Sequence, residues 1–253
     1  ETIARVAHDL DCHSVAYTYN DPVIFMEYAI DSAIACHERG IRTVAVTAGY
    51  ICDEPRREFF SHIDAANVDL KAFTERFYWK ITGAHLQPVL DTLVYLKHET
   101  GVWLELTTLL IPGENDSSGE IDEMTAWVVE QLGPDVPMHF TAFHPDYKMM
   151  DRPPTPAATL TRAREIAMKN GVRYAYTGNV IDETGGSTWC HGCGQRLIGR
   201  SQYLLTEWNL TGEGRCNKCG TACPGVFEAE PGTWGARRLP VRLRDYATTG
   251  KRA

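Results

Sequence analysis

The feature that constrains the fold most is an alternation of short β-branched or aromatic runs with longer helix-like stretches between residues 14 and 177. The predicted strands are Ser14–Tyr19, Thr43–Thr47, Ala66–Leu70, Val102–Leu110, Met138–Phe143 and Val172–Tyr176. The predicted helices are Ile24–Arg39, Gln87–His98, Ile121–Gln131 and Ala157–Lys169. This alternation indicates βαβ units, which form a parallel sheet covered by helices. Because such connections are right-handed, the units curl into a barrel or a doubly wound sheet.

The alternation stops at Gly185-Gly186-Ser187, which we interpret as a linker. We therefore expect three parts: an α/β barrel part over residues 1–184, a cysteine-paired segment over 185–230, and a basic, poorly ordered tail over 231–253.

Composition excludes several functional classes. Of the 253 residues, 43% are hydrophobic and 23% are charged, which is ordinary for a globular protein. The formal net charge of −8 argues against a general nucleic-acid binder. No apolar run is long enough to cross a bilayer, and we find no secretory hydrophobic region. We expect a cytoplasmic protein without nucleic-acid or membrane partners.

Polar residues follow five of the predicted strands. They lie in Thr18-Tyr19-Asn20-Asp21, Thr47-Ala48-Gly49, Asp69-Leu70-Lys71, Pro112-Gly113-Glu114-Asn115-Asp116 and His144-Pro145. Because ligands bind at the carboxyl ends of parallel strands, the pattern predicts a small-molecule site there. Each residue also has a structural explanation: Asp21 is a good helix cap before Pro22, Gly49 suits a left-handed turn, and Asp69 and Lys71 could pair with each other. The pattern over several strand ends favours binding.

Paired cysteines mark the last quarter of the chain. The chain contains two C-x2-C-G motifs, Cys190–Gly194 and Cys216–Gly220, with 22 residues between Cys193 and Cys216. One tetrahedral metal ion can gather four thiolates from two such turns, as in zinc ribbons. The predicted ligands are Cys190, Cys193, Cys216 and Cys219.

An iron–sulfur cluster is the alternative occupant of this segment. Cys216, Cys219 and Cys223 with Pro224 resemble the end of a ferredoxin motif, but its first cysteine is missing. An auxiliary cluster would therefore need Cys190 or Cys193. We favour zinc, with Cys223 as a spare thiol. Reduced cysteines without metal are the weakest reading, because the segment has few apolar residues to stabilise it.

Four segments, taken in order, resemble the radical S-adenosylmethionine (SAM) enzymes. They are Tyr17–Pro22, Gly40–Tyr50, Val68–Phe73 and Leu110–Gly113. More narrowly, the chain is similar to the radical SAM component of the AmmeMemoRadiSam system, a relative of pyruvate formate-lyase activating enzymes. The resemblance implies a partial (β/α)6 barrel. It also implies a [4Fe–4S] cluster on a C-x3-C-x2-C loop and reductive cleavage of SAM to a 5′-deoxyadenosyl radical, which abstracts hydrogen from a substrate.

The resemblance also implies the SAM-binding residues. Asn20 and Asp21 match the stretch that holds the methionyl amino group. By the same resemblance, Thr47, Ala48 and Gly49 lie beside it, Asp69 and Lys71 near the SAM carboxylate, and His144 near the nucleoside. No residue is assigned as hydrogen donor or acceptor. An electron donor and a substrate, protein or small molecule, complete the expected partners.

The chain departs from the family pattern in two ways. Asp21 stands where the family usually has Glu, and no C-x3-C-x2-C motif precedes Cys190. Cys12, Cys36 and Cys52 are too far apart to replace it. We therefore expect one of two situations. Either the cluster loop and the first βα unit lie upstream of residue 1 and this N-terminally truncated fragment is inactive alone, or the chain has lost the function.

Two other functions are compatible with the same residues. The first is a non-catalytic α/β module whose zinc ribbon binds a protein partner. The second is an aldolase-like barrel, for which Lys71 is the candidate Schiff-base lysine at a strand end.

Overall fold

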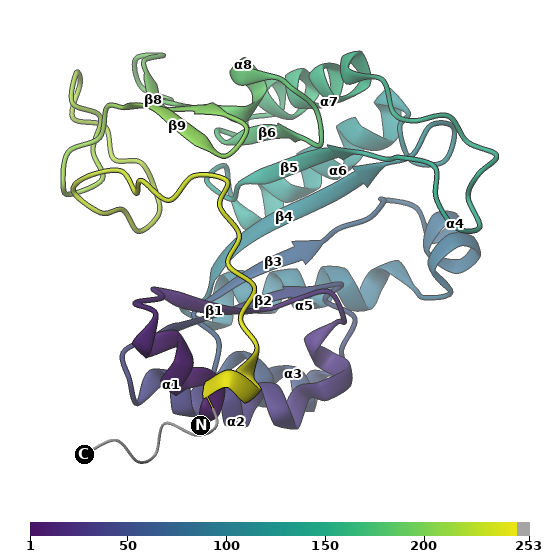
Figure 1. Ribbon diagram of the computed structural model, residues 1–253. Helices are drawn as coiled ribbons and strands as arrows, with labels where there is room; N and C mark the ends of the chain where they lie inside the picture. The colour runs from purple at the N-terminus through teal and green to yellow at the C-terminus, as the bar shows by residue number, and fades with distance from the viewer. Residues whose placement is uncertain (247–253) are drawn as a thin grey trace, which may run out of the picture. The chain divides into compact units, whose positions relative to one another are not determined.

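A computed structural model describes residues 1–246 of the chain, so residues 247–253 of the predicted basic tail lie outside the described residues. The chain forms two compact units (Figure 1). Of the described residues, the first unit contains Glu1–Asp69, Gln87–Leu104 and residues 238–246, and the second contains Leu70–Leu86 and Glu105–Arg237.

The first unit is built on three parallel strands in chain order, β1-β2-β3. Its elements are α1 (Thr2–Asp9), β1 (Ser14–Tyr17), the 3-10 helix η1 (Pro22–Phe25), α2 (Met26–His37), β2 (Arg42–Thr47), α3 (Asp53–Phe60), β3 (Ala65–Asp69), α5 (Leu86–Glu99) and η3 (Leu243–Tyr246). Ala29, Ala33 and Cys36 form a buried stripe on α2, as the 3.6-residue period requires.

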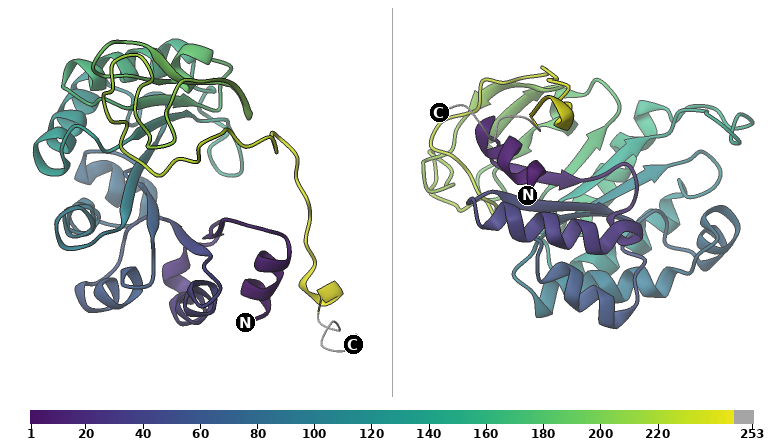
Figure 2. Two further views of the ribbon diagram at one scale, coloured as in Figure 1. Left: turned by 90° about the vertical axis from the view of Figure 1, so that its left-hand side faces the viewer. Right: turned by 60° about the horizontal axis from the view of Figure 1, so that its bottom comes forward.

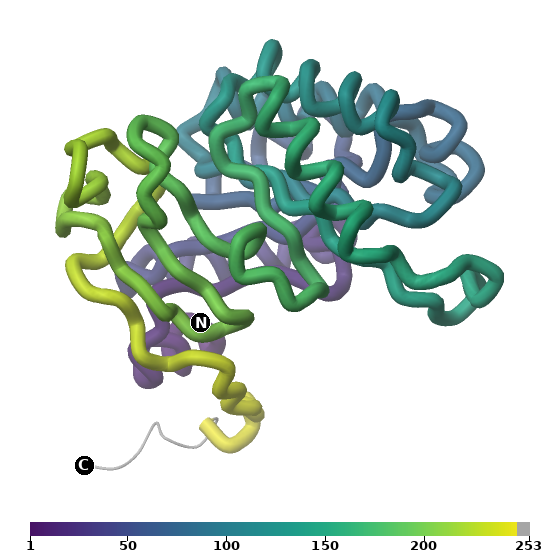
Figure 3. Tube along the Cα trace, turned by 90° about the horizontal axis from the view of Figure 1, so that it is seen from above, coloured from purple at the N-terminus to yellow at the C-terminus, as the bar shows by residue number. Residues whose placement is uncertain are grey.

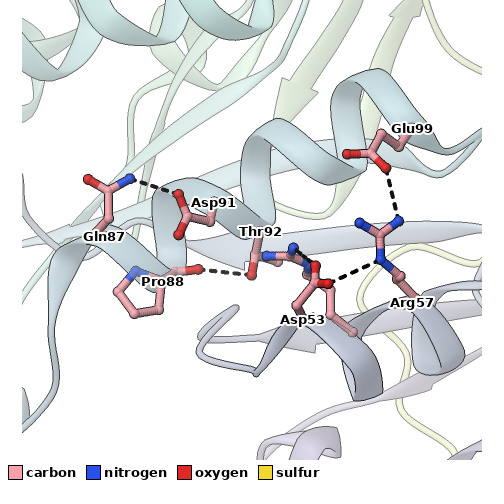
Figure 4. Close-up of polar contacts among 8 residues, drawn as sticks. Asp53, Arg57, Gln87, Pro88, Asp91, Thr92 and Glu99 are labelled. Carbon is pink, nitrogen blue, oxygen red and sulfur yellow. Dashed lines mark hydrogen bonds and ion pairs between the residues drawn. The ribbon is translucent and has the colours of Figure 1, made fainter.

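An exposed ion pair links α3 to α5, and a second one lies within α3. Arg57 Nη1 donates to Glu99 Oε2 at 3.0 Å and Arg57 Nε to Asp53 Oδ2 at 3.3 Å (Figure 4). Exposed ion pairs contribute little to stability. The burial of Phe59 and Phe60 therefore does more to hold α3 in the fold than these ion pairs do.

The C-terminal part of the first unit lies against its N-terminal helix. η3 packs beside α1 (Figure 2), and Arg5 Nη2 donates to the carbonyl oxygen of Tyr246 at 2.7 Å. The described end of the predicted tail therefore contains a short helix.

The second unit contains three more parallel strands in chain order, β4-β5-β6, and a separate antiparallel sheet, β7-β8-β9. Its elements are α4 (Glu75–Phe77), the π-helix η2 (Tyr78–Thr82), β4 (Trp103–Leu110), α6 (Ser118–Leu132), β5 (Met138–Ala142), α7 (Ala157–Lys169), β6 (Ala175–Gly178), α8 (Glu183–Gly186), β7 (Thr188–Trp189), β8 (Arg196–Ser201) and β9 (Leu204–Trp208). Leu106, Met138 and Phe140 share the fully buried face of this sheet, which α6 and α7 cover.

The predicted α/β class is confirmed. Six parallel strands alternate with helices, and strand order follows chain order within each unit, as in a partial barrel. A doubly wound sheet would reverse the order at a switch point. Among the described residues, no helix has the length and apolar character that a membrane span needs.

Several details differ from the sequence-based prediction. Strand β6 spans Ala175–Gly178 rather than the predicted Val172–Tyr176. Helix α3 was not predicted, because Asp53-Glu54-Pro55-Arg56-Arg57 lacks an apolar period. The segment predicted as a linker is packed: Gly185 belongs to α8, and an added Cβ there would lie 2.2 Å from Thr177 Oγ1. Ser187 is buried and donates to the Glu183 carbonyl at 2.6 Å. Its glycine therefore permits close packing rather than flexibility.

Candidate functional site

The first candidate site lies at the carboxyl ends of β1 and β2. We call it the Asp21 turn, defined as residues 18–23 together with 47–49. The Asn20 N–H donates to the Thr18 carbonyl at 3.1 Å, which forms a γ-turn around Tyr19. Tyr19 has φ +70° and is 100% exposed. A non-glycine residue with positive φ is costly, and no packing of the Tyr19 ring offsets that cost.

The carboxylate of Asp21 ties the two strand ends together. Oδ1 accepts from the Val23 N–H at 3.1 Å and from Thr47 Oγ1 at 2.8 Å. Oδ2 accepts from the Ala48 N–H at 2.8 Å. Asp21 therefore caps η1, as the structural explanation predicts, and also fixes the end of β2.

Gly49 is required by its surroundings. It has φ +67°, and an added Cβ would lie 2.8 Å from Val68 Cγ1 of β3. Its N–H donates to Thr47 Oγ1 at 3.1 Å. The backbone after β2 can follow this path only with glycine at position 49.

The other predicted SAM residues are distributed over both units. Asn20 is exposed within the Asp21 turn. Half-buried Asp69 ends β3 one position beyond Val68, which pairs with Thr47. Lys71 and His144 belong to the second unit. The structure thus joins Asp21, Thr47, Ala48 and Gly49 directly. The pairing suggested for Asp69 with Lys71 stays a prediction.

Asn115 is a buried residue that contacts the backbone at Lys71, and the sequence did not predict this contact. Its Nδ2 donates to the carbonyl oxygens of Lys71 at 2.6 Å and Leu109 at 2.9 Å. Its Oδ1 accepts from the Ile111 N–H at 2.6 Å. Asn115 therefore fixes the backbone at Lys71. The only sequence signal was the polar run after β4.

His144 lies near the start of the loop between β5 and α7. This loop extends away from β4–β6 (Figure 3), and the imidazole is exposed. Its assignment to the nucleoside stays a prediction.

The second candidate site is the four-cysteine cluster, formed by Cys190, Cys193, Cys216 and Cys219. Their sulfur atoms all lie within 4.8 Å of one another. Cys190 Sγ is 3.5 Å from Cys219 Sγ, and Cys193 Sγ is 3.7 Å from Cys216 Sγ. Tetrahedral thiolates at about 2.3 Å from one zinc ion lie about 3.8 Å apart. The cluster therefore has the size of a site for one metal ion.

Both C-x2-C-G turns have the same local geometry. The Gly194 N–H donates to the Cys190 carbonyl, and the Gly220 N–H donates to the Cys216 carbonyl, each at 2.9 Å. The two glycines have φ +72° and +75°. The repeated glycine in the sequence thus marks a left-handed position that closes each turn.

The electrostatics of the cluster favour a cation. Hydrogen bonds from the Thr221 hydroxyl and backbone lower the pKa of Cys219 to about 6. The Gln195 N–H favours the thiolate of Cys193, but the neighbouring thiols, Cys219 first, raise its pKa to about 12. Four such thiols cannot all ionise at this spacing unless a cation neutralises them.

Cys223 lies outside the cluster, in a small hydrophobic core. That core also contains Tyr174, Leu197, Ile198 and Leu210. Burial raises the pKa of the Cys223 thiol, which keeps it neutral. The segment thus has more apolar support than its composition suggested.

Comparison with known proteins gives both sequence relatives and structural neighbours. No protein-family model matches the chain. A protein of uncharacterised function from Methanocaldococcus jannaschii is 39% identical over 221 residues, which cover 87% of this chain and 65% of that protein. A 4-hydroxyphenylacetate decarboxylase activating enzyme from Clostridioides difficile is 22% identical over 178 residues, 66% of this chain and 55% of that enzyme. The chain thus spans little more than half of the activating enzyme.

Solved structures share the fold. A domain of a pyruvate-formate lyase-activating enzyme from Bacteroides vulgatus matches with a TM-score of 0.57 and 17% identity, covering 66% of this chain and 99% of that domain. SuiB from Streptococcus suis, solved with S-adenosylmethionine bound, matches with a TM-score of 0.56 and 16% identity, covering 70% of this chain and 42% of SuiB. Together with the sequence similarity to the 4-hydroxyphenylacetate decarboxylase activating enzyme, these matches confirm the predicted resemblance to the radical SAM superfamily.

Proposed function

We propose that this chain is the SAM-binding part of a radical SAM enzyme of the AmmeMemoRadiSam or glycyl-radical-activase type. The Asp21 turn carries the proposal, because it holds a carboxylate at the strand end that the resemblance assigns to the SAM amino group. Similarity to an activating enzyme supports the reaction class.

The residues of the Asp21 turn suit an ammonium ligand. A carboxylate offers about four acceptor positions, and three donors of the chain itself occupy Asp21. One acceptor position then remains for the amino group of SAM. In this proposal Asn20, Thr47, Ala48 and Gly49 shape the same end of the ligand, Asp69 and Lys71 bind near its carboxylate, and His144 near its nucleoside.

The cysteines of these 253 residues do not fit the reductive cluster. The sulfur atoms of the four-cysteine cluster lie close together in one group. The other candidates, Cys12, Cys36 and Cys52, are not spaced as C-x3-C-x2-C. A [4Fe–4S] cluster, when present, supplies the electron that cleaves SAM. Its ligands would therefore come from outside these residues, as would the electron donor and the substrate.

For the four-cysteine cluster we infer one structural zinc ion. The sulfur spacing supports a single ion over a polynuclear cluster, whose thiolates bind different irons and stand further apart. In this proposal Cys223 is a spare thiol, the ribbon orders the end of the chain, and the compartment is a reducing one such as the cytoplasm.

The test of the reaction starts from the reading frame upstream of the Glu1 codon. If that frame carries C-x3-C-x2-C, the extended protein is produced anaerobically, reconstituted with iron and sulfide, and reduced with dithionite. We expect SAM binding by calorimetry and 5′-deoxyadenosine by mass spectrometry. Asp21→Ala is expected to weaken SAM binding at least tenfold, whereas Asp31→Ala, an exposed acid on α2, leaves it unchanged.

The opposite result selects the alternative function. Absence of SAM binding in the reconstituted, extended protein would overturn the enzyme proposal. A non-catalytic module that binds a protein through its ribbon would then be the better assignment. Equal SAM affinity in the parent and in Asp21→Ala would show that the amino-group assignment is wrong.

A further inference from the structure

A polar cluster lies on the face of β4–β6 that is turned away from α6 and α7. Strand register places Thr107, His139 and Tyr176 in one row across the three strands. Glu105 precedes Thr107 by two positions and therefore shares this face. The opposite face carries the buried apolar side chains under the helices. We call Glu105, His139 and Tyr176 the His139 cluster.

His139 is held from two directions. Its Nε2 lies 2.7 Å from Glu105 Oε2, and its ring stacks on Tyr176 with centroids 5.0 Å apart and an interplanar angle of 20°. The carboxylate fixes the tautomer of a neutral imidazole, because Nε2 must then carry the proton. Nδ1 is left as the acceptor, and among the described residues it has no hydrogen-bond partner.

Tyr176 is itself fixed by the antiparallel sheet. Its hydroxyl lies 3.0 Å from Thr188 Oγ1, and Arg200 Nη1 donates to that oxygen at 2.7 Å. The Arg200 guanidinium also lies 5.8 Å from the centre of the Tyr176 ring. Burial raises the pKa of Tyr176, so the phenol stays neutral and keeps its hydroxyl proton. Thr188 and Arg200 therefore hold Tyr176 in place, and Tyr176 in turn supports the His139 ring.

The degree of burial sets this histidine apart from a surface pair. The side chains of His139 and Glu105 are 31% and 33% exposed, so they are partly desolvated yet reachable. The next row on the same face, Leu109, Thr141 and Gly178, has only small side chains on β5 and β6. A histidine with a purely structural role would be buried by neighbouring side chains. A fully solvated histidine would not need a carboxylate, an aromatic ring and an arginine to fix its position.

We propose that the His139 cluster is a ligand-binding centre in which His139 Nδ1 accepts a hydrogen bond from an O–H or N–H group of the ligand. Glu105 and Tyr176 are positioning residues: Glu105 selects the tautomer, and Tyr176 holds the plane of the ring. A ligand with a hydroxyl or ammonium group suits the neighbouring Glu105 carboxylate, whereas a carboxylate ligand would be repelled by it. The proposal does not depend on SAM chemistry.

The chain contains a matched control in His85. This residue also pairs with a carboxylate, Glu75, and stacks on an aromatic ring, Trp79, at 5.3 Å. Its contact uses Nδ1 rather than Nε2, and its side chain is 53% exposed. The two histidines should therefore show opposite tautomers when neutral.

The experiment uses the 253-residue chain labelled with 15N-histidine, with long-range 1H–15N correlation spectra recorded above pH 7.5. We expect His139 to be protonated at Nε2 and His85 at Nδ1. Glu105→Gln keeps an acceptor and should preserve the His139 tautomer, whereas Glu105→Ala should mix the two tautomers. Tyr176→Leu should broaden or shift the His139 signals, and neither change should move those of His85.

Ligand class is tested on the same spectra with two named probes. Ethanolamine supplies O–H and N–H donors and should shift His139 Nδ1 in a saturable way, at least tenfold more strongly in the parent than in Glu105→Ala. Acetate should have no such effect. An Nδ1-protonated His139, a tautomer indifferent to Glu105→Ala, or equal responses to acetate and ethanolamine would each overturn the proposal. Thermal melts of every variant distinguish these outcomes from loss of folding.

Discussion

The Asp21 turn and the four-cysteine cluster reach an ordered geometry by opposite routes. In the Asp21 turn, donors of the chain itself satisfy the carboxylate, and glycine lets the backbone pass close to Val68. In the four-cysteine cluster, the four sulfur atoms lie within 4.8 Å of one another. The first site is ordered without a ligand, and the proposed binding of SAM would use only its spare acceptor position. The second depends on the ion it would hold. The Asp21 turn is therefore expected to stay ordered without a ligand, whereas the four-cysteine cluster is expected to need its metal ion to become ordered.

Removal of a cluster cysteine should give the largest effect. Cys216 is 1% exposed and lies in the small core of the ribbon. Cys216→Ser is expected to abolish binding of about one zinc ion per chain and to melt the segment around β7-β8-β9, because structural zinc sites contribute folding energy directly. Metal content by mass spectrometry and hydrogen exchange of residues 188–223 measure both effects.

Cys223→Ser is the matched control for the cluster. Cys223 is buried in the same core but lies outside the four sulfurs, so zinc content should be unchanged. Iron and sulfide in stoichiometric amounts, lost with Cys223→Ser, would instead assign an auxiliary iron–sulfur cluster.

The Asp21 turn should respond to backbone changes rather than to metal. Gly49→Ala forces a side chain into positive φ and against Val68, so we expect a loss of about 2–4 kcal/mol in unfolding free energy. Gly40→Ala is the control, because Gly40 has φ +69° with no atom within 4 Å of an added Cβ. It should cost only about 1 kcal/mol. Equal losses in urea unfolding would show that the approach to Val68 is unimportant.

Loss of the Asp21 carboxylate should have a smaller effect. Asp21→Ala leaves the Ala48 N–H and the Thr47 hydroxyl without their acceptor, so we expect about 1–3 kcal/mol of destabilisation in urea unfolding. Thr47→Val removes a single side-chain donor and should cost about 1 kcal/mol. If the Asp21→Ala variant is as stable as the parent, the turn is not pre-arranged, and the contrast with the cluster disappears.

The sequence predicted the features that short spacing encodes. Two cysteines and a glycine within five residues determine each turn of the cluster, so its ligands could be identified without a structure. The alternation of apolar runs likewise indicated six parallel strands, although β6 begins three residues later than predicted. Asp21, Thr47 and Gly49 were found because they follow strands, although the bonds that join them connect positions 26 residues apart.

Features that depend on distant partners were missed. Asn115 fixes the backbone at Lys71, 44 residues away, and nothing in the local pattern indicates that contact. Glu105 and His139 are separated by 34 residues on different strands. Only the register of the sheet brings such polar residues together, and that register follows from packing of the whole face.

The smallest expected effect concerns Tyr19 and is a gain. The γ-turn holds this residue at φ +70° with a fully exposed ring, so its strain is not offset by packing. Tyr19→Gly should therefore raise the unfolding free energy by up to about 1 kcal/mol, because relief of the strain exceeds the entropy cost of glycine. Tyr19→Ala keeps the strain and should match the parent within error in urea unfolding. If both variants are less stable than the parent, the ring is packed in solution. If Tyr19→Gly alone is more stable than the parent, the turn retains backbone strain, which favours a functional contact for Tyr19. The Asp21 turn would then lower the stability of the fold, whereas metal binding at the four-cysteine cluster would raise it.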